Sequence, residues 1–525
     1  MISVCPIDPL ALIFPFLSLK ESRYFLLANK YVHSASRLRH AWNPEWKRDQ
    51  IIASDLSVTL QLYTLRVQTP QLQFLSLNAK GLEHIDRLST SLSLFSNLTW
   101  IDLSCPIVND FVLEALVKDH ALKIRSLTFC ATATTQRTFG KKKFIDLLKS
   151  LHNLQTFISH QPYFYVESEF GLEYLSKSRL VNSLTHLDLK SHGDYFITDN
   201  LMHLSKFQQL KTLFIAGCGT DFDRFAEALG KLHQLEELRL HDSNATLKYF
   251  QLLHKTSLCS IKRLEMFEAW NVHTKDFVTS DIFANLEDLT MRVSWQWART
   301  EVTIMLLERK ALQSCTNRLI SLKMESFFPT TLIEEGGFDT LSGLKELRCN
   351  STALCGEALR RMARFSPLLK ILSINGRCFT ENDYTDFNVQ DFERFEHLEE
   401  LHFVQLASLT DKDIRTLIAH SPPRLFNLYI TDCSKISCSS LFALAAAPPT
   451  MRLSRLEFRH IGLYAGFEAE LVLEATKALL HRNHLYFLKI VSHNFVRNLQ
   501  QQLQKYLSDT VCRPSHLPSC EIVIS

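Results

Sequence analysis

Charged side chains recur at every second residue of short leucine-bearing segments in the middle of the chain. In one segment Glu237, Arg239 and His241 alternate with leucines, which is typical of a strand that buries one face and exposes the other. Side chains presented in this way bind polar groups through hydrogen bonds and ion pairs. The two signs of charge alternate, so the pattern favours a protein or peptide ligand over a row of phosphates. The candidate binding residues are Glu237, Arg239, His241, Arg263, Glu265, Arg292, Lys323, Arg348 and Tyr429.

Pairing among these charges is the alternative to binding. Glu237 would face Arg263, and Arg239 would face Glu265, if their segments were neighbouring strands. Exposed pairs of this kind contribute little to stability. The sequence leaves both interpretations open.

The chain lacks the sequence motifs of common enzymes. It has no P-loop, G-x-G-x-x-G, H-E-x-x-H or G-x-S-x-G motif, and 14 glycines in 525 residues leave little for a phosphate cradle. Cys512, His516 and Cys520 are clustered but lack a fourth metal ligand, so we interpret them as part of a surface tail. We predict a binding protein with no catalytic residue, cofactor or metal of its own.

The composition limits the class of partner and the compartment. Apolar residues make up 46% and charged residues 22%, as in a globular protein. A formal net charge of +3 provides no general attraction to nucleic acid. No segment approaches the roughly 18 apolar residues of a membrane span, and residues 10–19 lack the flanks of a signal peptide. Thirteen scattered cysteines favour reduced thiols, hence the cytoplasm or the nucleus.

A repeated apolar pattern, L-x-x-L-x-L, positions the charged residues. In its clearest copy Leu425, Leu428 and Ile430 lead to Cys433 and to Ser437, which is suited to cap a helix. Spacings of 25 to 33 residues leave room for a strand, a turn and a full helix in each copy. A degraded seventeenth copy spans residues 517–524. Sixteen copies begin at Leu72, Leu98, Ile124, Leu154, Leu184, Leu210, Leu235, Ile261, Leu286, Leu319, Leu344, Leu369, Leu398, Leu425, Leu453 and Leu485.

This pattern resembles the leucine-rich repeats of the cysteine-containing subtype, which are similar to ribonuclease-inhibitor-like horseshoes. The resemblance rests on the period, on Cys218 and Cys433 at position nine, and on tails such as Leu409-Thr410-Asp411. It implies an α/β solenoid with a concave parallel sheet and convex helices, over residues 71–525. Positions three, five and seven of each copy would then face the concave side.

The N-terminal residues resemble an F-box. Asp8 is suited to cap a helix that would place Leu10, Ile13, Phe14 and Leu17 on one apolar face, although Pro15 interrupts it. The chain departs from the family pattern at Cys5, Pro9, Asn29 and Val32. We expect an F-box-like module over residues 1–48 and a linking helix over 49–70. The resemblance implies docking on the SCF linker protein, and through it on a cullin, by Pro6, Leu10, Ile13, Phe14, Phe16 and Leu17.

The two resemblances together imply a substrate-recognition subunit of an SCF-type ubiquitin ligase. The F-box would dock on the ligase, and the horseshoe would hold a protein substrate that the sequence does not identify. The alternative is a leucine-rich-repeat scaffold or inhibitor without a ligase, whose N-terminal helices only cap the first repeat.

Overall fold

The structure is a computed structural model of the 525-residue chain. It divides into two compact units, Met1–Asp242 and Ser243–Ser525, and each is considered by itself. The expected F-box-like module, its docking residues and the linking helix lie outside the described residues. The structure describes residues 74–76, 92, 97–103, 110–130, 141–160, 172–190, 201–216, 222–241, 260–267, 285–293, 305–307, 312–313, 318–326, 331–333, 336–350, 354, 357–376, 388–459, 469–480, 485, 487–491 and 521–524.

A strand begins two residues after each of the sixteen predicted starts, which confirms the repeat. In the first unit these strands are β1 Phe74–Ser76, β2 Trp100–Leu103, β3 Ser126–Cys130, β4 Thr156–His160, β5 His186–Lys190, β6 Thr212–Ala216 and β7 Glu237–His241. In the second unit they are β8 Arg263–Phe267, β9 Asp288–Val293, β11 Ser321–Ser326, β13 Glu346–Asn350, β14 Ile371–Asn375, β15 Glu400–Val404, β16 Asn427–Thr431, β17 Arg455–Arg459 and β18 Phe487–Val491.

Within each unit the strands pair in parallel with equivalent positions side by side. Leu428 at position four of β16 aligns with Leu401 of β15 and with Leu456 of β17. All three are fully buried, as is Ile430 at position six, whereas Asn427 and Tyr429 are half-buried on the other face. This register stacks leucine on leucine along the sheet, so the core is continuous from repeat to repeat.

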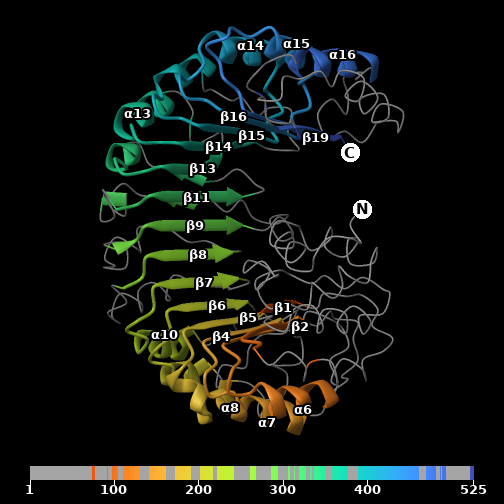
Figure 1. The fold of residues 1–525 in the computed structure, drawn as a ribbon. Coiled ribbons are helices and arrows are strands. Elements are labelled where there is room, and N and C mark those ends of the chain that lie inside the picture. The colour runs from red at the N-terminus through yellow and green to blue at the C-terminus, as the bar shows by residue number, and fades with distance from the viewer. Residues whose placement is uncertain are drawn as a thin grey trace, which may run out of the picture. The chain divides into compact units, whose positions relative to one another are not determined.

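Helices cover one face of the sheet in each unit (Figure 1). Those of the first unit are α6 Asp110–Asp119, α7 Lys141–Ser150, α8 Leu172–Lys177 and α10 Phe222–Gly230, and those of the second are α13 Ala358–Phe365, α14 Asp411–Ala419, α15 Cys438–Ala445 and α16 Ala469–Leu480. Parallel strands with helices on one side form a leucine-rich-repeat-like α/β fold. Among the described residues, no helix is long and apolar enough to cross a membrane.

The spacings leave room for a full helix in each copy, but several connections do not use that room. Short 3₁₀ helices occupy the described connections before β5, β6, β13 and β15, namely η5 Arg179–Asn182, η6 Met202–Lys206, η9 Gly337–Thr340 and η11 Val389–Arg394. The connections before β11 and β13 also hold two short strands, β10 Met305–Leu307 and β12 Thr331–Ile333, which pair with each other. Gly337 at the start of η9 lies close to β12, since a Cβ at that position would approach Ile333 Cγ2 to 2.7 Å.

The seventeenth strand, β19 Glu521–Ile524, lies two residues out of the predicted register. Ile522 pairs with Leu488 and Ile524 with Ile490, so position one falls at Ser519 rather than at Leu517. An apolar pattern of period two fits equally well after a shift of two residues. The hydrogen bonds to β18 therefore decide the register of β19.

The clearest copy of the repeat is built as the sequence predicts. Ser437 caps α15 by accepting a hydrogen bond from the Ser439 amide. Cys433 is fully buried, and its thiol lies 3.4 Å from the carbonyl oxygen of Thr431. Cys433 and the buried Cys349 and Cys438 are free thiols, as expected for small apolar fillers of a core.

Asp411 ties this copy to the one before it. Its carboxylate accepts hydrogen bonds from the Ser437 amide at 2.9 Å and from the Ser437 and Ser440 hydroxyls at 2.5 Å each. Burial alone would raise the pKa of Asp411, but the bonds from Ser437 and Ser440 outweigh it and hold the pKa below its usual value. The first residue of α14 therefore anchors the start of the next helix, α15.

Replacing Asp411 with asparagine should lower the free energy of unfolding by about 1–2 kcal/mol, because one charged acceptor is lost. The folded chain binds this proton more weakly than the unfolded chain. The contribution of Asp411 is therefore complete above the usual carboxyl pKa and is lost as the pH falls below about 4. Urea unfolding at pH 7 and at pH 3 measures both effects, with the exposed Glu396→Gln as control. A destabilisation by D411N that is equal at both pH values would contradict this role.

Candidate protein-interaction surface

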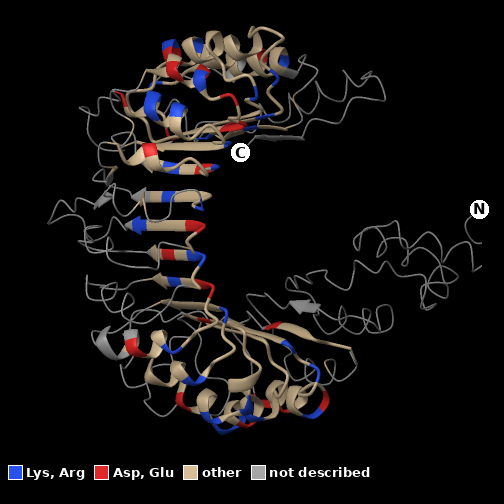
Figure 2. Cartoon of the chain, turned by 90° about the vertical axis from the view of Figure 1, so that its left-hand side faces the viewer, with Lys and Arg blue, Asp and Glu red and all other residues tan. Residues whose placement is uncertain are grey.

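Positions three, five and seven of the repeats form the sheet face opposite the helices, which we call the open face. Figure 2 shows charged residues on successive strands of the second unit. All nine binding residues predicted from the sequence lie on strands at these positions: Glu237, Arg239 and His241 on β7, Arg263 and Glu265 on β8, Arg292 on β9, Lys323 on β11, Arg348 on β13 and Tyr429 on β16. Their role in binding stays a prediction.

Two of the charged residues of β7 pair with each other. Arg239 Nε donates to Glu237 Oε1 at 2.7 Å, and the ring of His241 packs edge-on against Phe214 of β6 at 4.4 Å between centroids. The expected pairs of Glu237 with Arg263 and of Arg239 with Glu265 each join residues of different units, so they stay predictions.

Glu346 is the centre of a second charged group on the open face. Its carboxylate lies 3.1 Å from Lys323 Nζ and 2.9 Å from Arg348 Nε, and it accepts from the Ser321 hydroxyl at 3.1 Å. Burial acts to raise the pKa of Glu346, but Lys323 and Arg348 lower it further than burial raises it. Among the described residues, Arg292 also pairs with Glu265 at 3.7 Å. Ion pairs thus involve Glu265, Arg292, Lys323 and Arg348 within the second unit, although these four side chains stay partly exposed.

The open face of β15 to β18 carries a denser group of aromatic and charged residues, which we call the Tyr429 cluster. The rings of His402 and Tyr429, neighbours at position five, stack at 4.0 Å with 7° between their planes. The Arg455 guanidinium lies 5.6 Å from the centre of the Tyr429 ring and 4.2 Å from that of Phe487. The members are Glu400, His402, Asn427, Tyr429, Ser454, Arg455, Glu457, Arg459 and Phe487.

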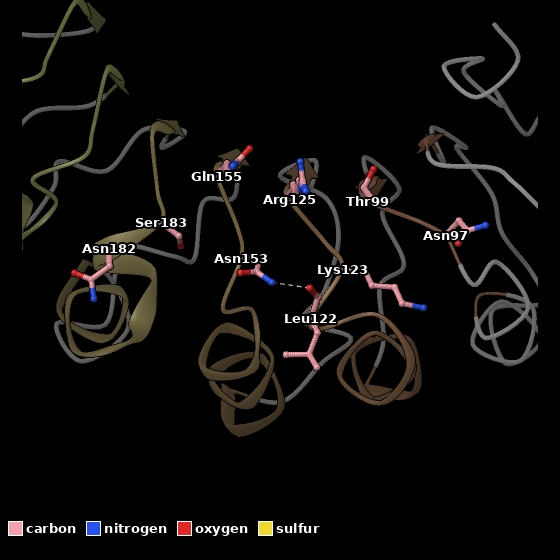
Figure 3. A pocket seen from close by; sticks show the side chains of 9 residues that line it. All are labelled: Asn97, Thr99, Leu122, Lys123, Arg125, Asn153, Gln155, Asn182 and Ser183. Atoms are coloured by element: carbon pink, nitrogen blue, oxygen red, sulfur yellow. Dashed lines mark hydrogen bonds between the residues drawn. The ribbon is translucent and has the colours of Figure 1, made fainter. Parts of the chain in front are cut away.

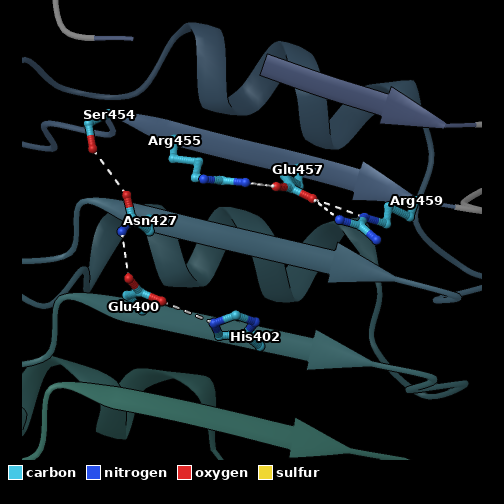
Figure 4. A network of polar contacts seen from close by, with 7 residues as sticks. All are labelled: Glu400, His402, Asn427, Ser454, Arg455, Glu457 and Arg459. Atoms are coloured by element: carbon cyan, nitrogen blue, oxygen red, sulfur yellow. Dashed lines mark hydrogen bonds and ion pairs between the residues drawn. The ribbon is translucent and has the colours of Figure 1, made fainter. Parts of the chain in front are cut away.

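Hydrogen bonds hold this cluster together across three strands (Figure 4). Asn427 Nδ2 donates to Glu400 Oε1 at 2.9 Å, and the Ser454 hydroxyl lies 3.1 Å from Asn427 Oδ1. His402 Nε2 lies 3.4 Å from Glu400 Oε2, and this contact is the largest cause of the lowered pKa of Glu400. The side chains are therefore ordered before any partner arrives.

Glu457 is a buried carboxylate between two arginines. Arg455 donates to its Oε1 from Nε at 3.0 Å and from Nη2 at 2.5 Å, and Arg459 donates to its Oε2 at 2.9 and 2.6 Å. Its side chain is 1% exposed, whereas each arginine is 43% exposed. Burial would raise the pKa of Glu457, but the arginine bonds outweigh it and leave the pKa lowered. Glu457 thus fixes both guanidinium groups while their outer edges stay accessible.

The Tyr429 cluster has the composition of a binding hot spot. Tyrosine and arginine dominate such sites because they offer large, rigid contact areas with few torsions to immobilise. The cluster has both residue types, already ordered by stacking and by Glu457. What it can do chemically is hold an acidic or aromatic side chain of another protein.

The sequence prediction named one member of this cluster and missed the others. Glu400, His402, Arg455, Glu457 and Arg459 occupy the same positions three, five and seven in later repeats, so the repeat pattern contains the signal. The burial of Glu457 has no such signal, because the other buried residues at position five, Thr128, Thr290 and Ser373, are small and uncharged.

Comparison with known proteins adds no family. No protein-family model and no curated protein matches the chain. A chain of the crystal structure of the Rad7 and Elc1 complex in yeast is 14% identical, with 79% of this chain and 85% of that chain covered and a TM-score of 0.39. A chain of the crystal structure of the TLR13–ssRNA13 complex is 15% identical, with a TM-score of 0.43. The match covers 84% of this chain and 56% of that chain, so it spans little more than half of that chain's length. Likenesses this distant carry no functional conclusion.

Proposed function

We propose that this chain binds a protein partner on its open face and serves as the substrate-recognition subunit of an SCF-type ubiquitin ligase. The Tyr429 cluster is the observation that carries the binding role. It gathers two aromatic rings, a histidine and two arginines on four adjacent strands, already ordered and partly exposed. The ligase role is supported by the F-box-like pattern of residues 6–17.

In this proposal the chain performs no bond chemistry. Its F-box-like residues dock on the SCF linker protein, and its open face holds the substrate. Binding both at once raises the effective concentration of substrate lysines near the ubiquitin-conjugating enzyme. Cytoplasmic or nuclear location is part of the proposal, since the ligase acts there.

Combined Phe14→Ala and Leu17→Ala substitutions should abolish recovery of the linker protein and cullin, because they remove two large apolar side chains from the docking face that the sequence predicts. The measurement is affinity purification of the tagged full-length chain followed by immunoblotting for both proteins. Lys20→Ala is the control, since Lys20 lies outside the proposed docking residues.

Two results would separate this proposal from its alternative. If the unsubstituted chain recovers neither linker protein nor cullin, the ligase role is wrong. If deletion of residues 1–48 then unfolds the repeats, as shown by loss of circular dichroism, those residues serve as a cap. The proposal that the full-length chain binds a partner on its open face would stand after either result.

A further inference from the structure

A polar pocket of about 650 Å³ lies in the first unit, at the sheet edge where β2 to β5 begin. It is separate from the open face, because none of its residues occupies position three, five or seven. Its nine residues come from four consecutive repeats and are shown in Figure 3: Asn97, Thr99, Leu122, Lys123, Arg125, Asn153, Gln155, Asn182 and Ser183.

The repeat itself builds this pocket. The position-one residues Leu98, Ile124, Leu154 and Leu184 are all fully buried and fix each loop against the core. The residues on either side of them point outward and form two rows. Figure 3 shows one row with Thr99, Arg125 and Gln155, and a second with Leu122, Lys123 and Asn153.

Hydrogen bonds between repeats keep the rows in place. Asn153 Nδ2 donates to the Leu122 carbonyl oxygen at 2.8 Å, and the Ser183 hydroxyl donates to that of Leu154 at 2.8 Å. The Arg125 amide donates to the Thr99 carbonyl oxygen at 2.7 Å. The pocket is therefore formed before a ligand binds, which lowers the entropic cost of binding.

The lining has a distinct chemistry. It contains the cations Lys123 and Arg125 but no carboxylate. The guanidinium of Arg125 is exposed and has no side-chain partner in the part of the chain that the structure describes. Leu122 is 66% exposed and supplies an apolar contact. Carboxamides at four positions, including Asn97 and Gln155, offer donors and acceptors together.

We propose that this pocket binds an extended acidic peptide segment of a protein partner. Peptide groups need a donor and an acceptor side by side, which carboxamides supply, whereas a phosphate chain offers acceptors alone and recruits many cations. Four strands spaced about 4.8 Å apart span about 14 Å, the length of roughly four extended residues. Arg125 and Lys123 bind the acidic side chains, and Leu122 contacts an apolar one. The chain thus carries a second binding surface in addition to the Tyr429 cluster.

Selection of a random decapeptide library displayed on phage against the full-length protein tests this proposal. We expect the selected peptides to share adjacent acidic residues, and we expect Arg125→Glu to lower their recovery about tenfold or more by charge repulsion. Arg125→Gln, which removes the charge without reversing it, should give an intermediate loss. The matched control is Lys345→Glu, the same charge change at position two of a repeat in the second unit. Circular dichroism verifies that each variant is folded.

Three outcomes would overturn the proposal. The first is a selected consensus without acidic residues. The second is an acidic consensus recovered equally by the wild-type and R125E proteins, or reduced equally by R125E and K345E. The third is a consensus kept by R125E but lost on Tyr429→Ala, which would assign the peptides to the open face. A single-stranded RNA decamer that binds in an Arg125-dependent way, with no acidic peptide selected, would identify a phosphate site instead.

Discussion

Replacing Phe403 with alanine should lower the free energy of unfolding by about 4 kcal/mol. The side chain is fully buried at position six of β15, and its ring meets that of Phe392 edge-to-face at 5.9 Å. Phe392 belongs to the six-residue η11 and also packs against the buried Phe395, with 6.4 Å between the ring centroids. The surroundings therefore have little freedom to collapse into the space that alanine leaves.

The location of the effect is as informative as its size. Each repeat contacts only its neighbours, so loss of protection should concentrate in β14, β15 and β16. Urea unfolding measures the change in free energy, and hydrogen exchange followed by mass spectrometry locates it. The adjacent Val404→Ala is the control, since Val404 lies on the open face and should cost about 1 kcal/mol or less. Equal losses for the two variants, or a loss of protection spread evenly over both units, would show that the stacking model is wrong.

The strands of this fold could be predicted from sequence because a single local rule governs them. From the copy that begins at Ile124 to the copy that begins at Leu485, the residues at positions one, four and six are all buried and, apart from Ser159, all apolar. Their spacing therefore reports the strand directly. The rule failed at β19, where a shift of two residues leaves the alternation unchanged. There Ile522 and Ile524, rather than Leu517 and Cys520, align with β18.

The connections on the helical face were less predictable for a physical reason. The spacing within one repeat predicts the length of its connection, but it does not encode the contacts with neighbouring repeats under which the connection forms an α-helix, a 3₁₀ helix or a short strand. The pairing of β10 with β12 is one example, since each of them is three residues long and needs the other for its hydrogen bonds.

The candidate surface was predictable in outline but not in detail. Register alone puts His402 beside Tyr429, because both occupy position five of adjacent repeats. It does not reveal that Glu457 is buried while the arginines that bind it stay half exposed. Such a carboxylate depends on two side chains folding over it, which is a three-dimensional property. The polar pocket at the start of β2 to β5 arises in the same way. Its residues lie about 26 to 30 positions apart in the sequence, and only the stacking of successive repeats brings them together.

Tyr429→Ala should weaken binding of an open-face partner by about 2 kcal/mol, or roughly thirtyfold. The substitution removes the ring that stacks on His402 and lies beneath Arg455. Arg455 keeps its bonds to Glu457, so the charge stays in place while the aromatic surface is lost. Because the tyrosine ring is only half-buried, folding stability should fall by about 1 kcal/mol or less.

Two matched variants isolate the aromatic face as the cause. Tyr429→Phe retains the ring, so it should retain binding to within about threefold, whereas Thr431→Ala changes the same strand and face outside the stack. Quantitative affinity purification of the four full-length proteins, followed by mass spectrometry, identifies partners depleted by Y429A and kept by both controls. A protein that depends on the Tyr429 hydroxyl would be lost with Y429F as well, and stacking would then not be the source of affinity. If no recovered protein distinguishes Y429A from the wild type, the Tyr429 cluster is not the binding site, and the charged group around Glu346 becomes the better candidate.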